Sequence, residues 1–272
     1  MEYETIDNTR VPKLGFGTFM IKDRTCYESV TDALQVGYRH IDTARIYGNE
    51  DQVGKAIAES GIKREDLFIT TKLWRDELRA EQVPDALEDS LKDLQTDYVD
   101  LCLIHWPVED VPVAETLGAM RQLQEQGLIR HLGVSNFTTY HLEQVQKTGI
   151  RIITNQVEYH AMLDQSELLQ KLKSMDMTLS AYSPLARGRL IDHPVLNKIA
   201  EKHGKTSSQV ALRWLLDQDS VWVLPKSSTS ERRRSNFDLF DFRLDDQDHH
   251  LINNELEKNK RIINPEFAPA WD

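Results

Sequence analysis

The stretch LFITTKLWRDELRAEQVPDALEDSLKDLQTDYVDLCLIH, residues 67–105, contains the pattern that decides the fold. Two short runs rich in apolar and β-branched residues, Leu67–Lys72 and Tyr98–Ile104, predict buried strands. Between them, apolar residues recur every three or four positions across Val83–Leu94, which predicts a helix with one face on a sheet. A strand, a helix and a second strand in this order are typical of a parallel α/β fold.

The same alternation recurs along the whole chain of 272 residues. The predicted strands are Gly15–Gly17, Arg39–Asp42, Leu67–Lys72, Tyr98–Ile104, Arg130–Val134, Ile152–Val157, Thr178–Tyr182 and Val221–Leu224. The predicted helices are Cys26–Val36, Glu50–Glu59, Val83–Leu94, Val113–Gln126, Leu142–Lys147, Ser166–Ser174, Pro194–Lys202 and Ser207–Leu216. Eight strands separated by helices predict a closed (β/α)8 TIM barrel, which takes roughly 250 residues.

A doubly wound open sheet is the competing architecture. It normally shows GxGxxG after its first strand, and this chain contains no such motif. No linker, repeat or low-complexity segment divides the sequence, so we expect residues 1–272 to form one domain. Glu2–Pro12 is expected to form an N-terminal β-hairpin at the bottom of the barrel. Lys258–Asp272 cannot continue as helix past Pro265, and we expect this C-terminal tail to lie over the active-site face.

Composition excludes several classes of protein. The chain has 33 Lys and Arg against 44 Asp and Glu, a net charge of −11, which argues against general binding to nucleic acid. Its two cysteines show no CxxC spacing, which disfavours a disulfide framework or a thiolate metal site and favours a reducing compartment. No apolar run approaches the ~20 residues of a membrane span, and no signal peptide is evident. We expect a cytoplasmic monomer without bound metal.

Four ionisable residues follow neighbouring predicted strands: Asp42, Tyr47, Lys72 and His105. Taken alone, each is ordinary, as a helix cap, a surface residue or a solvated charge. Active sites of barrels lie at the carboxyl ends of the strands, so the four should meet there. A carboxylate holds an amine charged, and the ammonium is expected to lower the pKa of an adjacent phenol. Such a tyrosine can donate a proton to a carbonyl oxygen that the histidine orients.

A second cluster follows the last predicted strand. Lys226 and Arg232 flank the hydroxyl residues Ser227, Ser228 and Thr229. Arginine, lysine and hydroxyl side chains suit phosphate oxygens, and barrels often bind phosphate after their final strands. The alternative is a solvated basic helix start with no ligand.

Five motifs resemble those of the aldo-keto reductases over nearly the whole chain. They are Gly15–Phe19, Gly37–Ala44 with Tyr47–Glu50, Gly133–Phe137, Asn155–His160, and Leu224–Ser228 followed by Arg232 and Asn236. The ending Arg261–Asp272 is similar to that of prokaryotic 2,5-diketo-D-gluconate reductases. The resemblance implies that Asp42, Tyr47, Lys72 and His105 are a catalytic tetrad, with Tyr47 as the proton donor.

The resemblance also implies a barrel that binds NADPH without a Rossmann domain. Its phosphate contacts would come from Lys226, Ser227, Ser228 and Arg232, and its adenine contact from Asn236. Arg233 and Ser235, on either side of this adenine contact in the sequence, depart from the family, which often has Ile and Glu at these positions. The remaining implied cofactor contacts are Thr18, Ser135, Asn136, Gln156, Tyr182, Ser183, Leu185 and Arg187.

The aromatic residues Phe19, Trp74 and Trp106 follow strand ends and are expected to form the walls of the substrate pocket. Short connections around the pocket favour small polar carbonyls. The implied reaction is NADPH-dependent reduction of small aldehydes and ketones, such as keto-sugar acids including 2,5-diketo-D-gluconate, or methylglyoxal-like α-dicarbonyls. Two alternatives remain: a regulatory barrel that binds NADPH, and a barrel lyase that forms a Schiff base on Lys72.

Overall fold

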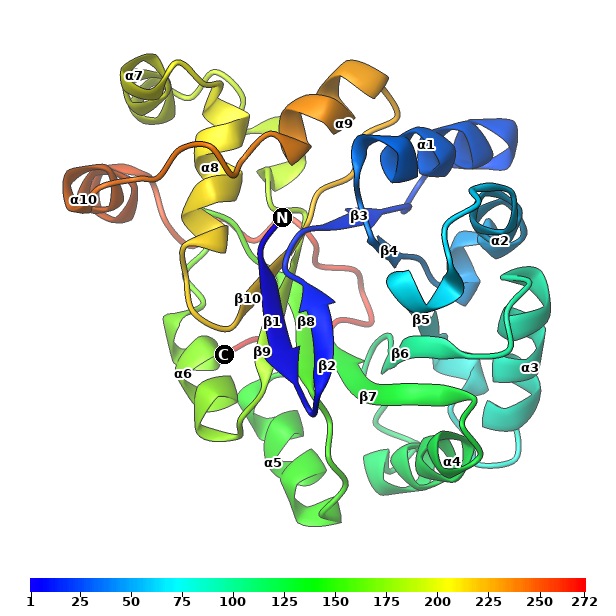
Figure 1. Ribbon diagram of the computed structural model, residues 1–272. Coiled ribbons are helices and arrows are strands. Elements are labelled where there is room, and N and C mark those ends of the chain that lie inside the picture. The colour runs from blue at the N-terminus through cyan, green and yellow to red at the C-terminus, as the bar shows by residue number, and fades with distance from the viewer.

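The computed structural model describes all residues from Met1 to Asp272, and it is a barrel of eight parallel strands surrounded by helices (Figure 1). The strands of the barrel are β3 (Gly15–Gly17), β4 (His40–Asp42), β5 (Phe68–Leu73), β6 (Val99–Ile104), β7 (Ile129–Ser135), β8 (Thr154–Glu158), β9 (Thr178–Tyr182) and β10 (Val221–Leu224). Each strand pairs with the next one in the chain. The predicted (β/α)8 barrel is confirmed, with every strand boundary within two residues of its prediction.

Helices follow the strands around the outside of the barrel. They are α1 (Asp23–Val36), α2 (Glu50–Glu59), α3 (Val83–Asp93), α4 (Val113–Glu125), α5 (Thr139–Thr148), α6 (Ser166–Ser174), α7 (Pro194–His203), α8 (Ser207–Leu216), α9 (Ser230–Phe237) and α10 (Asp246–Glu255). Short 3₁₀ helices are η1 (Arg45–Tyr47), η2 (Arg64–Asp66), η3 (Arg75–Glu77) and η4 (Ala186–Gly188). None of the helices is long and apolar enough to cross a membrane.

The first and last strands meet at a seam that closes the sheet. Leu14 forms a parallel bridge with Val223, and the Val223 amide donates to the Lys13 carbonyl at 2.7 Å. Gly15 is required at this seam, because a Cβ atom there would lie 2.6 Å from Leu224 Cδ2 and 2.9 Å from His40 Cγ. Packing of the Leu224 and His40 side chains against β3 therefore depends on a residue without a side chain.

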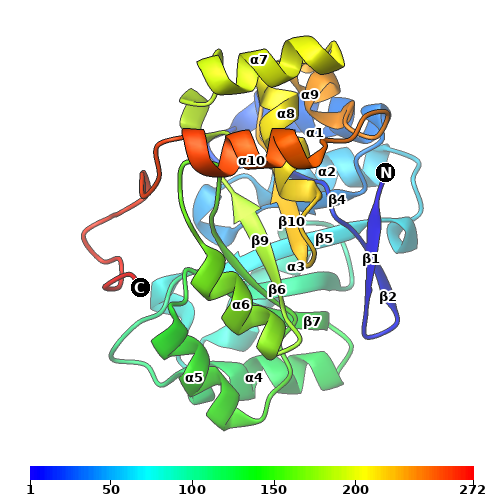
Figure 2. The ribbon, with the colours of Figure 1, turned by 90° about the vertical axis from the view of Figure 1, so that its left-hand side faces the viewer.

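The N-terminal hairpin lies across one end of the barrel (Figure 1). Its strands β1 (Tyr3–Ile6) and β2 (Thr9–Pro12) pair antiparallel, as predicted. Ile6 and Val11 join an apolar cluster with residues of the barrel strands such as Trp222, whose Nε1 donates to Glu4 at 2.8 Å. Figure 2 shows the hairpin and the C-terminal segment on opposite sides of the barrel. The other end of the barrel, which the hairpin does not cover, is therefore available for a functional site.

Two helices were not predicted, α9 and α10. Helix α9 has the sequence SERRRSNF, which has almost no apolar face and so lacks the 3.6-residue pattern on which the prediction depends. Helix α10 is capped by the preceding residue Asp245, whose side chain accepts a hydrogen bond from the Asp248 amide. This cap stabilises a helix start that the apolar pattern does not mark.

Candidate active site

A cavity of about 1480 Å³ opens at the carboxyl ends of the barrel strands. Seventeen of the twenty predicted site residues line it: Phe19, Asp42, Tyr47, Trp74, His105, Trp106, Asn136, Gln156, Tyr182, Ser183, Leu185, Arg187, Lys226, Ser227, Ser228, Arg232 and Asn236. The other three, Thr18, Lys72 and Ser135, are buried outside this lining. The structure therefore gathers predicted residues that are up to 217 positions apart in the chain, from Phe19 to Asn236.

Lys72 is the centre of the predicted tetrad. Its side chain is fully buried at the end of β5, where Nζ donates to Asp42 Oδ1 at 2.6 Å and to the Thr43 carbonyl at 2.7 Å. The same nitrogen lies 3.4 Å from the Tyr47 hydroxyl. Tyr47 reaches this position because the chain turns through η1 directly after β4, and Gly48 ends that turn with a positive φ of 59°.

The expected lowering of the Tyr47 pKa is wrong for this structure. Burial, followed by the negative charge of Asp42, raises the pKa of Tyr47 well above its ordinary value. Burial also lowers the pKa of Lys72, although Asp42 opposes that effect. Desolvation by the surrounding protein outweighs the attraction between phenolate and ammonium, although Tyr47 is only half-buried and lines the cavity. Tyr47 is therefore protonated at neutral pH, which is the form that a proton donor needs.

His105 directly follows β6, and its ring is edge-on to Tyr47 and Trp74, with centroids 5.7 and 5.1 Å away. Burial, together with the charge of Lys72, lowers the pKa of His105 well below its ordinary value. The imidazole is thus neutral and has one N–H donor. Its Nδ1 is buried without a hydrogen-bond partner. A neutral donor beside the Tyr47 phenol suits the orientation of a carbonyl oxygen.

Polar side chains from β7, β8 and β9 hold the base of the cavity together. Gln156 Nε2 donates to Asp42 Oδ2 at 2.7 Å, so the carboxylate is bound on both oxygens. The Tyr182 hydroxyl donates to Asn136 Oδ1 at 2.7 Å, and Asn136 Nδ2 donates to the His105 carbonyl at 3.0 Å. Residues expected to contact nicotinamide are therefore mutually fixed before any ligand binds. Their role toward that ring stays a prediction.

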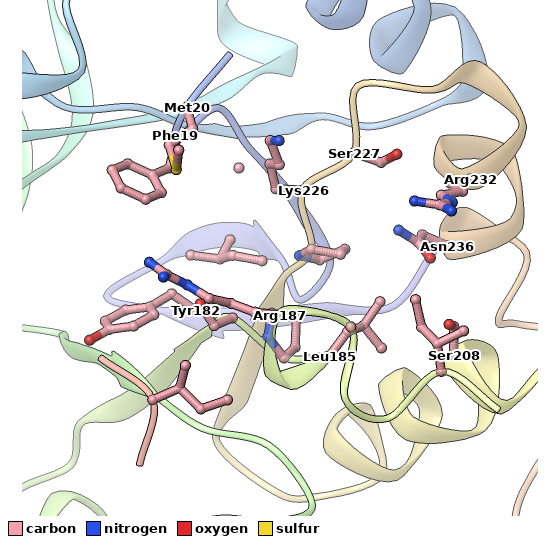
Figure 3. A pocket seen from close by; sticks show the side chains of 18 of the residues that line it. Phe19, Met20, Tyr182, Leu185, Arg187, Ser208, Lys226, Ser227, Arg232 and Asn236 are labelled. Atoms are coloured by element: carbon pink, nitrogen blue, oxygen red, sulfur yellow. The ribbon is translucent and has the colours of Figure 1, made fainter. Parts of the chain in front are cut away.

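The opposite end of the cavity is basic. Figure 3 shows Lys226, Ser227, Arg232 and Asn236 together, from the loop after β10 and from α9, with Phe19, Met20 and Tyr182 farther along. Partial desolvation lowers the pKa of Lys226, although its side chain is exposed, and no carboxylate opposes that shift. Unpaired cations beside hydroxyl groups are a donor set that fits a phosphate group.

The chain matches the model of the aldo/keto reductase family over residues 13–257. It belongs to that family. The protein is therefore an oxidoreductase that acts on carbonyl groups, and such reductases use a nicotinamide cofactor.

Relatives of this aldo/keto reductase are named for small dicarbonyls. The glyoxal reductase of Bacillus subtilis is 45% identical over 258 residues, covering 94% of this chain and 92% of that protein. The methylglyoxal reductase DkgA of Escherichia coli is 41% identical over 260 residues, covering 94% and 93%. A solved structure described as a candidate 2,5-diketo-D-gluconic acid reductase B superposes with a TM-score of 0.95 at 44% identity, covering 98% of this chain and 95% of that one.

Arg233 has a structural role in this reductase. It is buried and its Nε donates to Asp32 Oδ2 on α1 at 2.6 Å, while Nη1 donates to the Ser227 carbonyl at 3.1 Å. Arg234 also pairs with Asp32, at 3.2 Å. These two arginines therefore hold α9 against α1 and do not line the cavity with Arg232. Their adjacency to Arg232 in the sequence does not reveal this difference in role.

The C-terminal tail supplies one wall of the reductase's pocket. We expected the tail to lie over this face, but none of its residues was among the predicted pocket residues. Phe267 packs edge-on against Trp74 and Trp106, with centroids 5.9 and 5.3 Å away. Five of the seven exposed large apolar side chains of the molecule line this cavity: Phe19, Met20, Ile46, Ile191 and Phe267. The rim is thus more apolar than the short connections suggested. The only signal in the sequence was an aromatic residue between Pro265 and Pro269.

Proposed function

We propose that this reductase uses NADPH to convert small aldehydes and α-dicarbonyls to alcohols, with Tyr47 as the proton donor. One observation supports this most strongly: Lys72 Nζ contacts both Asp42 and the Tyr47 hydroxyl, beside a neutral His105. This group combines a proton donor, a cation that stabilises its conjugate base and a hydrogen-bond donor for a carbonyl.

The cavity is long enough to hold a nucleotide as well as a substrate. Lys226, Ser227, Ser228 and Arg232 would hold the 2′-phosphate of NADPH, which NADH lacks, and Asn236 would contact adenine. The pyrophosphate would lie near Ser183, Leu185 and Arg187, and the nicotinamide near Asn136, Gln156 and Tyr182. Thr18 and Ser135 lie just outside the cavity lining at this end, where their hydroxyls donate hydrogen bonds to the carbonyls of Asp42 and Gln156. When bound, NADPH supplies the hydride for the carbonyl carbon.

The residues of the chain provide the proton and the orientation. His105 holds the carbonyl oxygen, and Tyr47 donates its phenolic proton to that oxygen. The charge left on the phenolate lies next to the Lys72 ammonium, which Asp42 and the Thr43 carbonyl hold in place. Solvent then returns a proton to Tyr47. The product is an alcohol with one hydrogen on carbon from the hydride and one on oxygen from Tyr47.

The Schiff-base lyase is the weaker alternative. Lys72 is fully buried, and its amine is already bound to a carboxylate and a carbonyl oxygen, so it is not free to attack a substrate. A purely regulatory barrel would not need the four tetrad residues in contact. We also infer a cytoplasmic monomer, which size-exclusion chromatography with light scattering tests for its oligomeric part.

The direct test is a spectrophotometric screen. Oxidation of NADPH at 340 nm would be followed with glyoxal, methylglyoxal, simple aldehydes and keto-sugar acids such as 2,5-diketo-D-gluconate. We expect turnover with α-dicarbonyls and a weaker rate with NADH. Absence of NADPH oxidation with every carbonyl would contradict the proposal. The same screen decides between dicarbonyls and keto-sugar acids.

A further inference from the structure

Glu158 is a buried carboxylate that the proposed mechanism does not use. It is the last residue of β8, and its side chain is fully inaccessible to solvent. Oε1 accepts hydrogen bonds from the Ile262 amide at 2.8 Å and from His160 Nε2 at 2.9 Å, and Oε2 accepts one from the Ile263 amide at 2.7 Å. Burial by itself would raise the pKa of Glu158, but these hydrogen bonds outweigh it and lower the pKa.

The two amides belong to the C-terminal tail, which follows α10 without regular secondary structure. Before them, Lys258 and Lys260 bond to the carbonyls of Ala161 and Met162. After them, the Asp272 side chain bonds to Thr139. Between residues 261 and 267, the bonds to Glu158 are the only hydrogen bonds that join the tail to the barrel.

This segment of the tail forms one side of the cavity. Ile262, Ile263, Asn264, Pro265 and Phe267 all line it. Phe267 lies four residues after Ile263 and completes an aromatic wall with Trp74 and Trp106, next to His105. Arg75 stacks on the Phe267 ring at 4.3 Å. The hydrogen bonds of Glu158 thus fix the tail backbone close to this wall, in addition to the contacts of Phe267 itself.

We propose that Glu158 is a positioning residue for the carbonyl substrate, because its carboxylate fixes the tail backbone that places Phe267 over the catalytic end of the cavity. The inference rests on the proposed function for its kinetic part. Hydrogen bonds to an ionised acceptor are roughly twice as strong as neutral ones. A single buried carboxylate with two consecutive amides can thus hold a segment that has no helix or strand to support it.

The first test is Glu158→Gln, which keeps the shape and removes the charge. A glutamine amide group cannot accept a hydrogen bond at its nitrogen, so one tail amide loses its partner. We expect KM for the carbonyl substrate to rise about five-fold, with kcat within two-fold of wild type. The Kd of NADPH, measured by quenching of tryptophan fluorescence, should not change. Amide hydrogen exchange should become faster in residues 261–267.

A second variant acts on the tail and leaves the barrel interior intact. Ile263→Pro removes the amide that donates to Glu158 Oε2, and it should give the same rise in KM and the same faster exchange. Phe267→Ala should reproduce the KM effect alone. In the double variant Glu158→Gln/Phe267→Ala, KM should be no higher than in Phe267→Ala, because both changes act through the same wall.

An unchanged KM in either folded variant, Glu158→Gln or Ile263→Pro, would overturn the proposal. Additive KM effects in the double variant would also overturn it, since Glu158 would then act by another route. If the wild-type protein reduces no carbonyl, the proposed function fails, while hydrogen exchange still tests whether Glu158 holds the tail. Exchange rates in residues 261–267 that match wild type would refute that part.

Discussion

The two ends of the cavity are built differently. At the catalytic end, polar groups bind one another before a ligand arrives: Lys72 and Gln156 each donate to Asp42, and Tyr182 donates to Asn136. At the phosphate end, Lys226 and Arg232 are exposed and take part in no ion pair or side-chain hydrogen bond, although the neighbouring Arg233 and Arg234 both pair with Asp32. The first end is preorganised, whereas the second presents two unpaired cations to the phosphate group that we propose binds there.

This difference suggests that one end of the cavity serves the chemical step and the other serves cofactor binding. Preorganised groups lower the barrier of a reaction because they need little reorganisation when charge develops. Exposed cations add affinity for a phosphate but do not touch the reacting atoms. Changes at the catalytic end should therefore lower kcat, and changes at the phosphate end should raise the KM of the cofactor. Four experiments test this division, from the largest expected effect to the smallest.

Tyr47→Phe should have the largest effect. Removing the hydroxyl removes the proton donor, so kcat should fall roughly 10³-fold, within the range of general acid catalysis. Binding of NADPH should stay within two-fold of wild type, as measured by fluorescence titration. Tyr140→Phe is the matched control, because Tyr140 is 64% exposed on α5 and away from the cavity. A near wild-type kcat in Tyr47→Phe would show that Tyr47 is not the proton donor.

Arg232→Ala tests the phosphate end. Loss of one charge-assisted contact to the 2′-phosphate should raise KM for NADPH about ten-fold and leave KM for NADH nearly unchanged. Steady-state kinetics with both cofactors would measure this. Arg234→Ala is the control, since Arg234 lies outside the cavity. Equal effects of Arg232→Ala on the two cofactors would contradict a 2′-phosphate site.

The pH dependence of stability tests the burial of His105. Burial and Lys72 depress the His105 pKa in the folded state, so the unfolded chain takes up this proton first as pH falls below ~6.5. The stability contributed by His105 is therefore present above that pH and is lost below it, by up to about 1.4 kcal/mol per pH unit.

Urea unfolding between pH 7.5 and 5 would measure the slope of the free energy of unfolding against pH. His105→Gln should make the slope shallower, and a change at the exposed His250, His250→Gln, should leave it as in wild type. The same slope in the His105 variant as in wild type would show that the histidine is not held neutral.

Asp32→Asn should give the smallest effect. It weakens the ion pair with Arg233, which holds α9 against α1 and also bonds the Ser227 carbonyl. We expect the Kd of NADPH to rise about three-fold, with KM for the carbonyl unchanged. Asp85→Asn, an exposed change on α3, is the control. A change in carbonyl KM without a change in NADPH binding would mean that the two ends are not independent.

Much of the catalytic end could be predicted because it follows from where strands end. Asp42 ends β4, Lys72 lies within the last two residues of β5, and His105 follows β6, so an apolar run that predicts a strand also places its neighbouring polar residue. Tyr47 lies five residues after Asp42, and the chemistry of a phenol beside a lysine indicates its role before the family motif adds to it. The direction of its pKa shift could not be predicted, since it depends on how strongly the folded protein desolvates the phenol and on how close Asp42 lies.

The sequence by itself determined the barrel, its strand order and the neighbouring positions of the four residues of the predicted tetrad, because hydrophobic period and strand ends are local features that the chain repeats eight times. Only the tertiary structure decided that Arg233 faces Asp32 and not the cavity, and that Phe267 completes the aromatic wall. It also decided that Glu158 meets the amides of Ile262 and Ile263. These contacts join segments that are distant in the chain, and their directions depend on packing that no local pattern encodes.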